Sequence, residues 1–437
     1  MSHEKTNGVI VAAPHSGAGK TLFTLGLLRA LTRMGVSVAG AKVGPDFIDP
    51  AFHQRSTGLA CRNLDLWAMG TIGVRNQIAA TATGVDFIVL EGVMGLFDGA
   101  DDGTGSTAHV AKTLDIPIIL LIDASAQSWS VAPLVHGFST FDKDVKIAGV
   151  VFNKVSTPRH RSLLERAVEP LGIPVLGCLP RVNDLTMPSR HLGLVQADEY
   201  NNLDTFIEQA ADMVASEVDL KKLQEVAEPV DTDGTVADVL PPLGQHIAIA
   251  RDQAFTFSYP HLLMGWRDAG AEVSFFSPLN DEVPSKGADA IFLPGGYPEL
   301  HAGVLAGNHT FLESLRAKAS DNLIYGECGG YMVLGDRLVD AEGVSHKMAG
   351  LLPVTTSFEN RKRTLGYRRL SHKSPLPWPE ALRGHEFHYS TQMSESDDTP
   401  LFESADANGV CLPPMGVIRG NVMGSYAHVI SASEAHA

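Results

Sequence analysis

The sequence contains few cysteines, and their spacing excludes two common roles. Cys61, Cys178, Cys328 and Cys411 are scattered among 437 residues, and no two of them form a C-x-x-C pair. A disulfide-stabilised domain or a structural zinc site needs clustered cysteines or cysteine–histidine pairs. The sequence therefore predicts neither of these.

Long apolar runs are also lacking. The run at residues 116–122, IPIILLI, is far shorter than the roughly 20 apolar residues that a membrane-spanning helix needs. The first residues, MSHEKTNGVIVAAP, do not have the charged, apolar and small-residue regions of a cleavable signal peptide. The cytoplasm is therefore the expected compartment.

Basic residues are too few for an anionic polymer or surface to be an expected partner. The chain has 34 Lys and Arg against 50 Asp and Glu, a formal net charge of -16. Such a surplus repels phosphate backbones and anionic lipids, so we expect neither nucleic acid nor membrane as a partner. With 44% hydrophobic residues, the composition is that of an ordinary globular protein with two or three domains.

The first half of the chain alternates between apolar runs and helical patterns. The runs are continuous rather than alternating, which is typical of buried parallel strands; they lie at residues 8–13, 36–43, 86–91, 116–123, 147–153 and 173–179. The segment after Lys20 predicts a helix, with Gly35 just beyond its end. This pattern predicts an α/β fold with a P-loop-type parallel sheet.

A second α/β domain follows a weak segment. Residues 217–243 begin with a short charged helix and end in an acidic stretch rich in Pro and Gly, which favours a linker. Apolar runs resume at residues 247–252, 271–278, 290–296 and 323–332. We therefore expect an ATP-binding domain at residues 1–216, a linker at 217–243 and a second domain at 244–437.

Residues 13–21, APHSGAGKT, follow the first strand and open the first helix, as a phosphate-binding loop does. Its glycines allow backbone N–H groups to approach an anion, its lysine reaches the terminal phosphates, and its threonine can ligate Mg²⁺. The strict pattern begins with Gly, whereas this chain has Ala13, and the alternative is a glycine-rich turn. The predicted ATP-binding residues are Ser16, Gly17, Ala18, Gly19, Lys20 and Thr21.

Carboxylates follow two further strands. Asp46 and Asp49 lie in VGPDFIDP, and Glu91 and Asp98 lie in VLEGVMGLFDG. Because strand ends of a parallel sheet meet at one edge, we expect Asp46 and Glu91 to hold Mg²⁺ with Thr21, and Asp49 and Asp98 to line the surrounding substrate site. The alternative for each is a carboxylate that caps a helix or turn.

The end of the strand at residues 147–153 adds one more candidate. Asn153 lies at the carboxyl end of that run, so we expect its amide to read the adenine edge of the nucleotide.

A different chemistry is indicated by the segment LIYGECGGYM. Glycines around Cys328 allow a sharp strand-to-helix turn that exposes a nucleophile, and a helix N-terminus lowers the pKa of a thiol. The turn of Gly295 and Gly296 in FLPGGYP, with Gly329, predicts an oxyanion and glutamine site. His428 in GSYAH is the expected base. The alternative is a Cys328 that only fills the core, as we expect of the other cysteines.

Together these motifs resemble the cobyrinate a,c-diamide synthase family, including members that use hydrogenobyrinate. They are VGPDFIDPAFH, NLDLWAM, EGVMGLFDG, MPSRHLGL, LPGGYPEL, GECGGYMVLG, GHEFHYS and GSYAH, and they span nearly the whole chain. The resemblance implies a dethiobiotin-synthetase-like ATP domain fused to a class I glutamine amidotransferase domain. It implies a carbon–nitrogen ligase that amidates the c and a acetate side chains of a corrin precursor through acyl phosphates, in cobalamin biosynthesis. The family's nucleophile falls on Cys328, and its histidine on His428.

One position departs from the wider class. Most class I glutaminases carry His-x-Glu, but position 430 is Ile. The cobyrinate-type branch also lacks that Glu, so a Cys–His pair is expected, although relatives often continue His-x-His-Phe where this chain has His428-Val-Ile-Ser. What orients the imidazole does not follow from the sequence.

A basic segment is the expected contact for a polycarboxylate tetrapyrrole. Residues 361–373 carry six Lys or Arg in an acidic chain, and a carboxylate-rich macrocycle needs such groups. The candidates are Arg361, Arg363, Arg368, Arg369, His385 and His388, with a solvated loop face as the alternative. ATP, glutamine and the tetrapyrrole are the expected ligands, with Mg²⁺ as cofactor and a homodimer as the expected assembly.

Two other functions share these features. An amidase acting on another tetrapyrrole, such as nickel sirohydrochlorin, needs the same catalytic motifs. A P-loop ATPase switch with an inactive glutaminase-like domain explains the phosphate loop but not an intact turn around Cys328.

Overall fold

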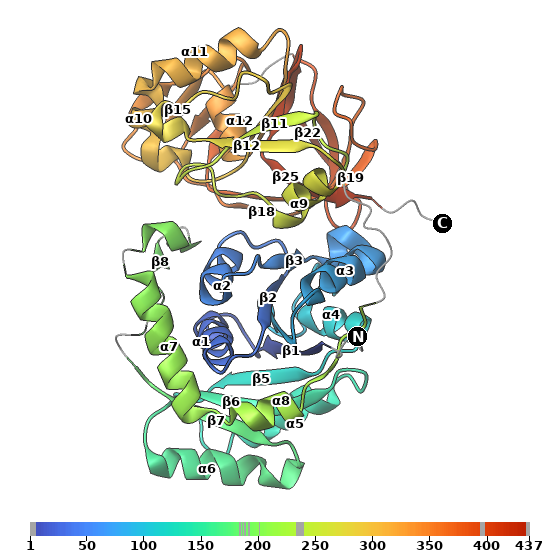
Figure 1. Ribbon diagram of the computed structural model, residues 1–437, viewed down its shortest axis with the longest axis vertical. Helices are drawn as coiled ribbons and strands as arrows, with labels where there is room; N and C mark the ends of the chain where they lie inside the picture. Colours follow the sequence, from blue (N-terminus) through green and yellow to red (C-terminus); the bar gives the residue numbers. More distant parts are fainter. Residues whose placement is uncertain are drawn as a thin grey trace. The chain divides into compact units, whose positions relative to one another are not determined.

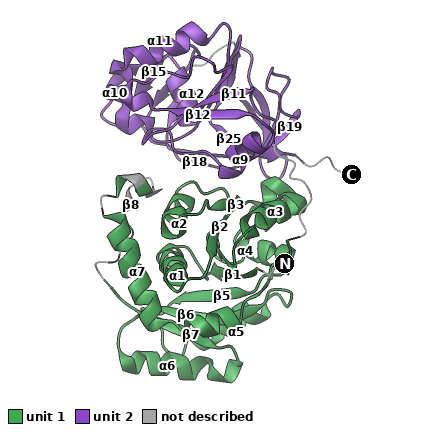
Figure 2. Ribbon diagram, viewed as in Figure 1, with its two compact units in different colours: residues 1–237 green, residues 238–437 purple. Residues whose placement is uncertain are grey.

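In the computed structural model, the chain divides into two compact units, residues 1–237 and 238–437 (Figure 2). The structure describes residues 6–182, 185, 187, 189–190, 193–200, 202–232, 240–393 and 398–433. Pro188, His191 and Leu192 of the MPSRHLGL motif and residues 233–239 of the predicted linker lie outside these ranges.

The first unit is built on a parallel sheet with strand order β3-β2-β4-β1-β5-β6-β7. Its strands are β1 (Asn7–Ala12), β2 (Val38–Val43), β3 (Arg62–Leu64), β4 (Phe87–Glu91), β5 (Ile118–Asp123), β6 (Ile147–Val155) and β7 (Val175–Pro180). Except for β3, these strands are the continuous apolar runs of the sequence, buried because helices cover the sheet. The predicted parallel α/β fold is confirmed.

Helices cover both faces of this sheet. They are α1 (Lys20–Arg33), α2 (Asp49–Thr57), α3 (Leu66–Ala82), α4 (Thr107–Leu114), α5 (Val131–Thr140), α6 (Pro158–Val168), α7 (Leu203–Glu217) and α8 (Leu220–Glu225). In Figure 1, α1, α2 and α7 lie on one side of the sheet, and α3 and α4 lie on the other. Gly35 follows α1 with φ 83°, as predicted for the residue beyond a helix end.

The start of the predicted linker is ordered. Residues 220–225 form α8, and β10 (Glu228–Pro229) pairs antiparallel with β1. These residues therefore belong to the first unit.

The second unit contains a sheet with strand order β12-β11-β13-β14-β24-β23, in which β23 is antiparallel. Its strands are β11 (His246–Ala250), β12 (Glu272–Phe276), β13 (Ala290–Leu293), β14 (Leu323–Glu327), β23 (Val417–Arg419) and β24 (Val422–Ser425). The helices are α9 (Pro260–Asp268), α10 (Ala302–Gly307), α11 (His309–Lys318) and α12 (Gly329–Leu334). This confirms a second α/β domain.

Two further sheets complete the second unit. One has the order β22-β21-β18-β19-β25 and is antiparallel, with β18 (Thr364–Ser371), β19 (Ala381–His388), β21 (Phe402–Ala405), β22 (Cys411–Met415) and β25 (Ala427–Ala432). The other has the order β16-β15-β17-β20, with β15 (Arg337–Val339), β16 (Ser345–Lys347), β17 (Thr355–Ser357) and β20 (Thr391–Gln392). The sequence patterns did not predict these sheets.

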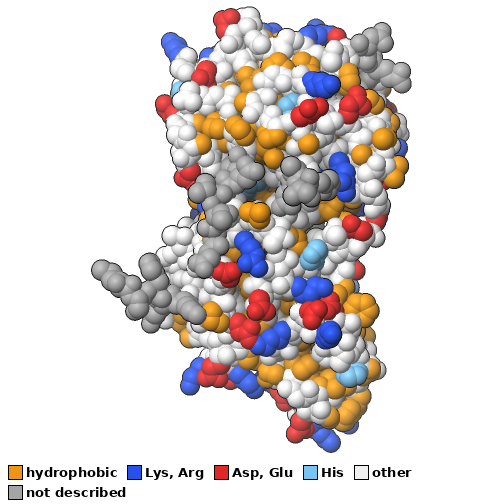
Figure 3. All heavy atoms as spheres, turned by 90° about the vertical axis from the view of Figure 1, so that its right-hand side faces the viewer, with side chains coloured by type: hydrophobic (Ala, Val, Ile, Leu, Met, Phe, Trp, Pro, Cys, Tyr) orange, Lys and Arg blue, Asp and Glu red, His pale blue; other side chains and the backbone are white. Residues whose placement is uncertain are grey.

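The surface shows how the net charge is distributed. On the face drawn in Figure 3, acidic and basic side chains lie interspersed among apolar atoms. The surplus of acidic residues is therefore not gathered into a single field on this face. Among the described residues, no helix is long and apolar enough to cross a membrane.

Close packing of α1 against α7 generates a stability prediction. A Cβ on Gly26 would lie 2.5 Å from the carbonyl oxygen of Ala210 and 2.7 Å from Val214. We expect Gly26→Ala to lower the free energy of unfolding by about 1–3 kcal/mol, because α7 must move. Gly137→Ala in α5, where nothing lies within 4 Å, is the control and should stabilise by about 0.5–1 kcal/mol. Denaturant unfolding measures both, and equal effects would contradict this packing.

Candidate functional site

The predicted phosphate loop connects β1 to α1. Gly17 and Gly19 adopt φ values of 79° and 102°, which side chains other than glycine rarely tolerate. The amide of Asn153, on β6, donates to the carbonyl oxygen of Ala18 at 2.8 Å. The loop is therefore open for backbone contacts with an anion and is held by a side chain from β6, two strands away from β1 in the sheet.

Lys20 begins α1 and is largely buried. Its ammonium group donates to the carbonyl oxygen of Met94 at 2.5 Å, in the loop after β4. Burial lowers the pKa of Lys20, while nearby carboxylates such as Glu91 oppose this shift. The lysine thus lies between the phosphate loop and the loop after β4.

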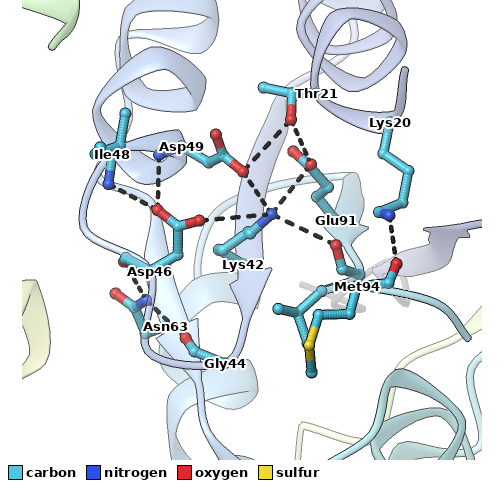
Figure 4. Close-up of polar contacts among 12 residues, drawn as sticks. Lys20, Thr21, Lys42, Gly44, Asp46, Ile48, Asp49, Asn63, Glu91 and Met94 are labelled. Atoms are coloured by element: carbon cyan, nitrogen blue, oxygen red, sulfur yellow. Dashed lines mark hydrogen bonds and ion pairs between the residues drawn. The ribbon is translucent and has the colours of Figure 1, made fainter. Parts of the chain in front are cut away.

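A buried cluster of charges lies beside Thr21 (Figure 4). The hydroxyl of Thr21 donates to Glu91 Oε1 at 2.8 Å and lies 3.4 Å from Asp49 Oδ2. The ammonium of Lys42, at the end of β2, lies 2.5 Å from Asp49 and 3.0 Å from Glu91. These side chains converge from different elements, because the carboxyl ends of parallel strands meet at one edge.

The charges of this cluster depend on one another. Burial disfavours the ammonium of Lys42, but Asp49 and Glu91 outweigh it and raise its pKa. Burial also disfavours a charged Glu91, yet Lys42 and His53 lower its pKa. Burial and the nearby Asp46 raise the pKa of Asp49 to about 7. Removing Lys42 would therefore leave buried carboxylates without their main counter-charge.

Asp46 and Asp98 each hold a turn. Asp46 Oδ1 accepts from the backbone N–H groups of Ile48 and Asp49, at 2.7 and 3.1 Å. Asp98 Oδ2 accepts from the N–H of Gly95 at 2.9 Å. These contacts match the alternative prediction, in which each carboxylate caps a turn. Asp46 also lies beside the charged cluster, because its Oδ2 is 4.0 Å from Lys42 Nζ.

Two members of the cluster, Lys42 and His53, were not predicted from the sequence. Lys42 lies near the end of an apolar strand. A lysine is rarely buried without a partner, so its position in that strand could have identified it as a candidate site residue. His53 is buried on α2, and its Nε2 lies 2.7 Å from Glu91 Oε2. The two groups form an ion pair, but their geometry is not that of a hydrogen bond. The contacts of His53 with Cys61 and Glu91 outweigh burial and raise its pKa to about 10.

The donor atoms around Thr21 suit a magnesium ion. Hydroxyl and carboxylate oxygens are the ligands that Mg²⁺ prefers. Asp49 Oδ1 is buried and has no hydrogen-bond partner among the described residues, so it can accept a cation. The described residues contain no cluster of three or more His, Cys, Asp or Glu arranged to hold a metal by themselves. A Mg²⁺ ion shared with nucleotide phosphates fits these oxygens, since it takes few protein ligands.

In the second unit, Cys328 lies at the turn between β14 and α12. Its φ of 47° and ψ of -105° are unusual for a residue with a side chain. Its N–H donates to the carbonyl oxygen of Ser425 at 2.8 Å, which ties the turn to β24. A Cβ on Gly330 would overlap the carbonyl of Leu293 on β13, so the turn requires glycine there. This is the predicted strand-to-helix elbow.

The predicted glycines and His428 gather at this elbow. His428 lies on β25, which follows β24 after a single residue. A Cβ on Gly295 would lie 3.1 Å from His428 Nε2 and 3.2 Å from Cys328 Cβ, so only glycine leaves room between them. A Cβ on Gly329 would likewise lie 3.1 Å from the backbone N of Gly296. These contacts place Cys328, His428 and the two glycine turns together, with the Sγ of Cys328 3.9 Å from the carbonyl oxygen of Phe387.

The expected lowering of the thiol pKa is wrong for this structure. Burial, with a smaller effect of Glu299, raises the pKa of Cys328 and outweighs the N–H of Gly329. Burial, with His385 and His388 nearby, lowers the pKa of His428 to about 3. The resting pair is therefore a neutral thiol and a neutral imidazole, which can accept the thiol proton.

The arginines of the basic segment at residues 361–373 are of two kinds, exposed or paired with other protein groups. Arg361 and Arg363 are exposed in the loop before β18. Arg368 pairs with Glu386 at 2.7 Å, and Arg369 donates to the carbonyl oxygen of Ala407 at 2.9 and 3.1 Å. The first two guanidinium groups are available to a ligand, whereas the other two already have protein partners.

The two predicted histidines lie on β19. His388 contacts Glu386 at 2.9 Å, and the Cα of His385 pairs across the sheet with that of His428. The structure thus places His385 beside the elbow, and its role toward a macrocycle stays a prediction.

Comparisons with known proteins match both parts of the chain. Residues 9–195 match the CobQ/CobB/MinD/ParA nucleotide binding domain, and residues 246–436 match the CobB/CobQ-like glutamine amidotransferase domain. The chain is 52% identical to hydrogenobyrinate a,c-diamide synthase of Brucella suis, over 98% of this chain and 99% of the relative. It is 49% identical to the Rhizobium meliloti protein of that name, over 98% and 100%, and 48% identical to the Rhodobacter capsulatus protein, over 98% and 99%.

Buried neutral histidines predict a loss of stability in acid. Burial, together with Arg368, lowers the pKa of His385 from 6.5 to about 4. Between these values the unfolded chain binds a proton that the folded chain does not, so stability falls as pH drops below about 6.5.

We expect His385→Gln to remove roughly 1–2 kcal/mol of the stability difference between about pH 7.5 and pH 5. His309→Gln, at an exposed histidine of the same unit, is the control and should leave the difference unchanged. Thermal unfolding of both variants at the two pH values makes the comparison. The same acid sensitivity in His385→Gln and the wild type would contradict a neutral, buried His385.

Proposed function

The chain belongs to the hydrogenobyrinate a,c-diamide synthase family, and from this we propose that it amidates the a and c acetate side chains of hydrogenobyrinate in cobalamin biosynthesis, using ATP and glutamine. The observation that carries the proposal is that one chain holds both a phosphate loop with a carboxylate cluster and a cysteine elbow with a facing histidine. Amidation of a carboxylate needs these two chemistries, activation of the acid and release of ammonia.

Ammonia release uses the elbow. His428 takes the proton of the Cys328 thiol, and the sulfur attacks the side-chain amide carbon of glutamine. The negative oxygen that forms is stabilised by backbone N–H groups of the turn of Gly295, Gly296 and Gly329. The C–N bond then breaks, His428 returns the proton to the leaving nitrogen, and ammonia departs. Water hydrolyses the remaining thioester to glutamate.

Acid activation uses the phosphate loop. A carboxylate oxygen of the macrocycle attacks the γ-phosphorus of ATP, the bond to ADP breaks, and an acyl phosphate forms. Lys20 and the loop N–H groups stabilise the charge on the transferred phosphoryl group. Ammonia then attacks the acyl carbon, and phosphate leaves with the oxygen. The products are an amide, ADP and phosphate, which makes the reaction that of a carbon–nitrogen ligase.

Thr21, Glu91 and Asp46 would hold Mg²⁺ bound with the nucleotide. Bound there, Mg²⁺ would neutralise charge on the β- and γ-phosphates. Lys42 keeps Asp49 and Glu91 together, so these carboxylates are placed before any ligand arrives. Asn153 supports the loop through Ala18, and its predicted contact with adenine belongs to this proposal.

The macrocycle is recognised through its free carboxylates. Arg361 and Arg363 are the exposed candidates for bidentate carboxylate pairs, whereas Arg368 and Arg369 would first have to leave their protein partners. Asp49 and Asp98 stay candidates for the edge of the substrate site. A cytoplasmic location and a homodimer also belong to the proposal.

The alternatives have less support. The name shared by these relatives gives no support to nickel sirohydrochlorin as substrate. An ATPase switch with an inactive glutaminase domain does not explain why Cys328, Gly295 and His428 are gathered at one turn.

Two variants test the division of labour. Cys328→Ala should abolish amidation with glutamine but keep it with a high concentration of ammonium, because acid activation occurs elsewhere. Lys20→Ala should lower amidation with either nitrogen source by about a hundredfold or more, since it removes a preorganised charge contact. Product formation is followed by mass spectrometry of the macrocycle.

Cys411→Ala, at an exposed cysteine, is the control and should behave as the wild type. If folded Cys328→Ala lost both activities equally, the glutaminase assignment would be wrong. Near-normal turnover of Lys20→Ala with ammonium would refute the role of the phosphate loop.

A further inference from the structure

Glu327 is a buried carboxylate at the end of β14, directly before Cys328. Its Oε1 accepts hydrogen bonds from the hydroxyl of Tyr325 and the backbone N–H of Val429, each at 3.0 Å. Its Oε2 lies 3.7 Å from Nδ1 of His428. One carboxylate oxygen is therefore held by the protein, and the other faces the imidazole.

We propose that Glu327 positions His428 for proton transfer, in place of the glutamate that position 430 lacks. The proposal rests on the proposed function, because it assigns a role within glutamine hydrolysis. A histidine that accepts a proton at Nε2 must carry its own proton on Nδ1, and a carboxylate facing Nδ1 favours that tautomer. Glu327 also stabilises the imidazolium that forms when Cys328 is deprotonated.

The backbone explains why Glu327 can do this. The register of β14 against β24 pairs Glu327 with Ser425, and β25 then brings Val429 and His428 next to the carboxylate. Because Glu327 is bound to the residue after His428, carboxylate and imidazole keep a fixed relation. The 3.7 Å separation is longer than a hydrogen bond, and such catalytic contacts commonly tighten only when substrate is bound.

A second carboxylate near the elbow is less suited to this role. Glu386 binds Arg368 at 2.7 Å and His388 at 2.9 Å, so its two oxygens are engaged with other charged or polar groups. Burial raises the pKa of Glu327 to about 8, although Val429 and Tyr325 oppose the shift. The imidazolium that forms at His428 during the reaction opposes this shift, because a nearby positive charge favours the ionised carboxylate.

The test is Glu327→Gln in the full-length protein. The amide keeps the shape, and its oxygen still accepts from Tyr325 and Val429. Its NH₂ group would donate to Nδ1 of His428, which forces the proton onto Nε2 and blocks uptake of the thiol proton. We expect kcat for glutamine hydrolysis to fall on the order of 10²–10⁴-fold, with KM for glutamine changed less than about threefold. Amidation with ammonium should be unchanged.

Two further variants separate positioning from a structural role. Glu327→Asp keeps the charge and should recover part of kcat. Tyr325→Phe removes one hydrogen bond to Glu327 but leaves its charge, and should cost less than about tenfold in kcat. A kcat of Glu327→Gln within about threefold of wild type, or a loss that appears in KM alone, would overturn the proposal. So would an equal loss of the ammonium-dependent activity in each Glu327 variant.

A different experimental result would contradict the proposed function itself. If Cys328→Ala kept glutamine-dependent amidation, no glutaminase role at this elbow would stand. If Cys328→Ala lost that activity but Glu327→Gln kept it, only the role of Glu327 would be wrong.

Discussion

The unusual backbone at two strand-to-helix junctions is the constraint on which both sites depend. In the first unit, positive φ at Gly17 and Gly19 exposes the N–H groups of the phosphate loop. In the second unit, the positive φ falls on Cys328 itself, and a residue with a side chain pays about 1–3 kcal/mol for such a conformation. The turn is fixed by the hydrogen bond of Cys328 to Ser425 and by Gly330, which packs on Leu293 of β13, and both keep the thiol in place.

Electrostatic balance is the second requirement, and the two units meet it differently. In the first, Lys42 and His53 counter the buried carboxylates Asp49 and Glu91, so the cluster is charged but compensated. In the second, burial keeps Cys328 and His428 neutral, and Glu327 lies ready for the charge that appears during reaction. The first arrangement suits binding of a charged nucleotide, and the second suits transfer of a proton.

Much of the fold could be predicted from the sequence. Continuous apolar runs alternating with helical patterns indicated parallel sheets, and Gly35 marked the end of α1, because these signals depend on neighbours along the chain. The antiparallel sheet containing β18 and β19 was missed, since its strands are mostly half-buried and carry Arg and His rather than long apolar runs.

The sites were predictable where local turn chemistry determines them. The phosphate loop and the Cys328 elbow are short glycine-rich motifs, so their conformations follow from adjacent residues. Lys42, His53 and Glu327 act through partners far along the chain, which only the strand order brings together. The pairing of Arg368 with Glu386 likewise follows from the register of a hairpin, which the sequence did not reveal.

The central claim is that nitrogen released at the cysteine elbow reaches carboxylates that ATP has activated. Incubating the protein with hydrogenobyrinate, ATP, Mg²⁺ and glutamine labelled with ¹⁵N at its side-chain amide tests this most directly. Mass spectrometry of the macrocycle should show two labelled amides, formed only when ATP is present. An unlabelled macrocycle, with the ¹⁵N recovered entirely as free ammonium while ATP is hydrolysed, would contradict the account.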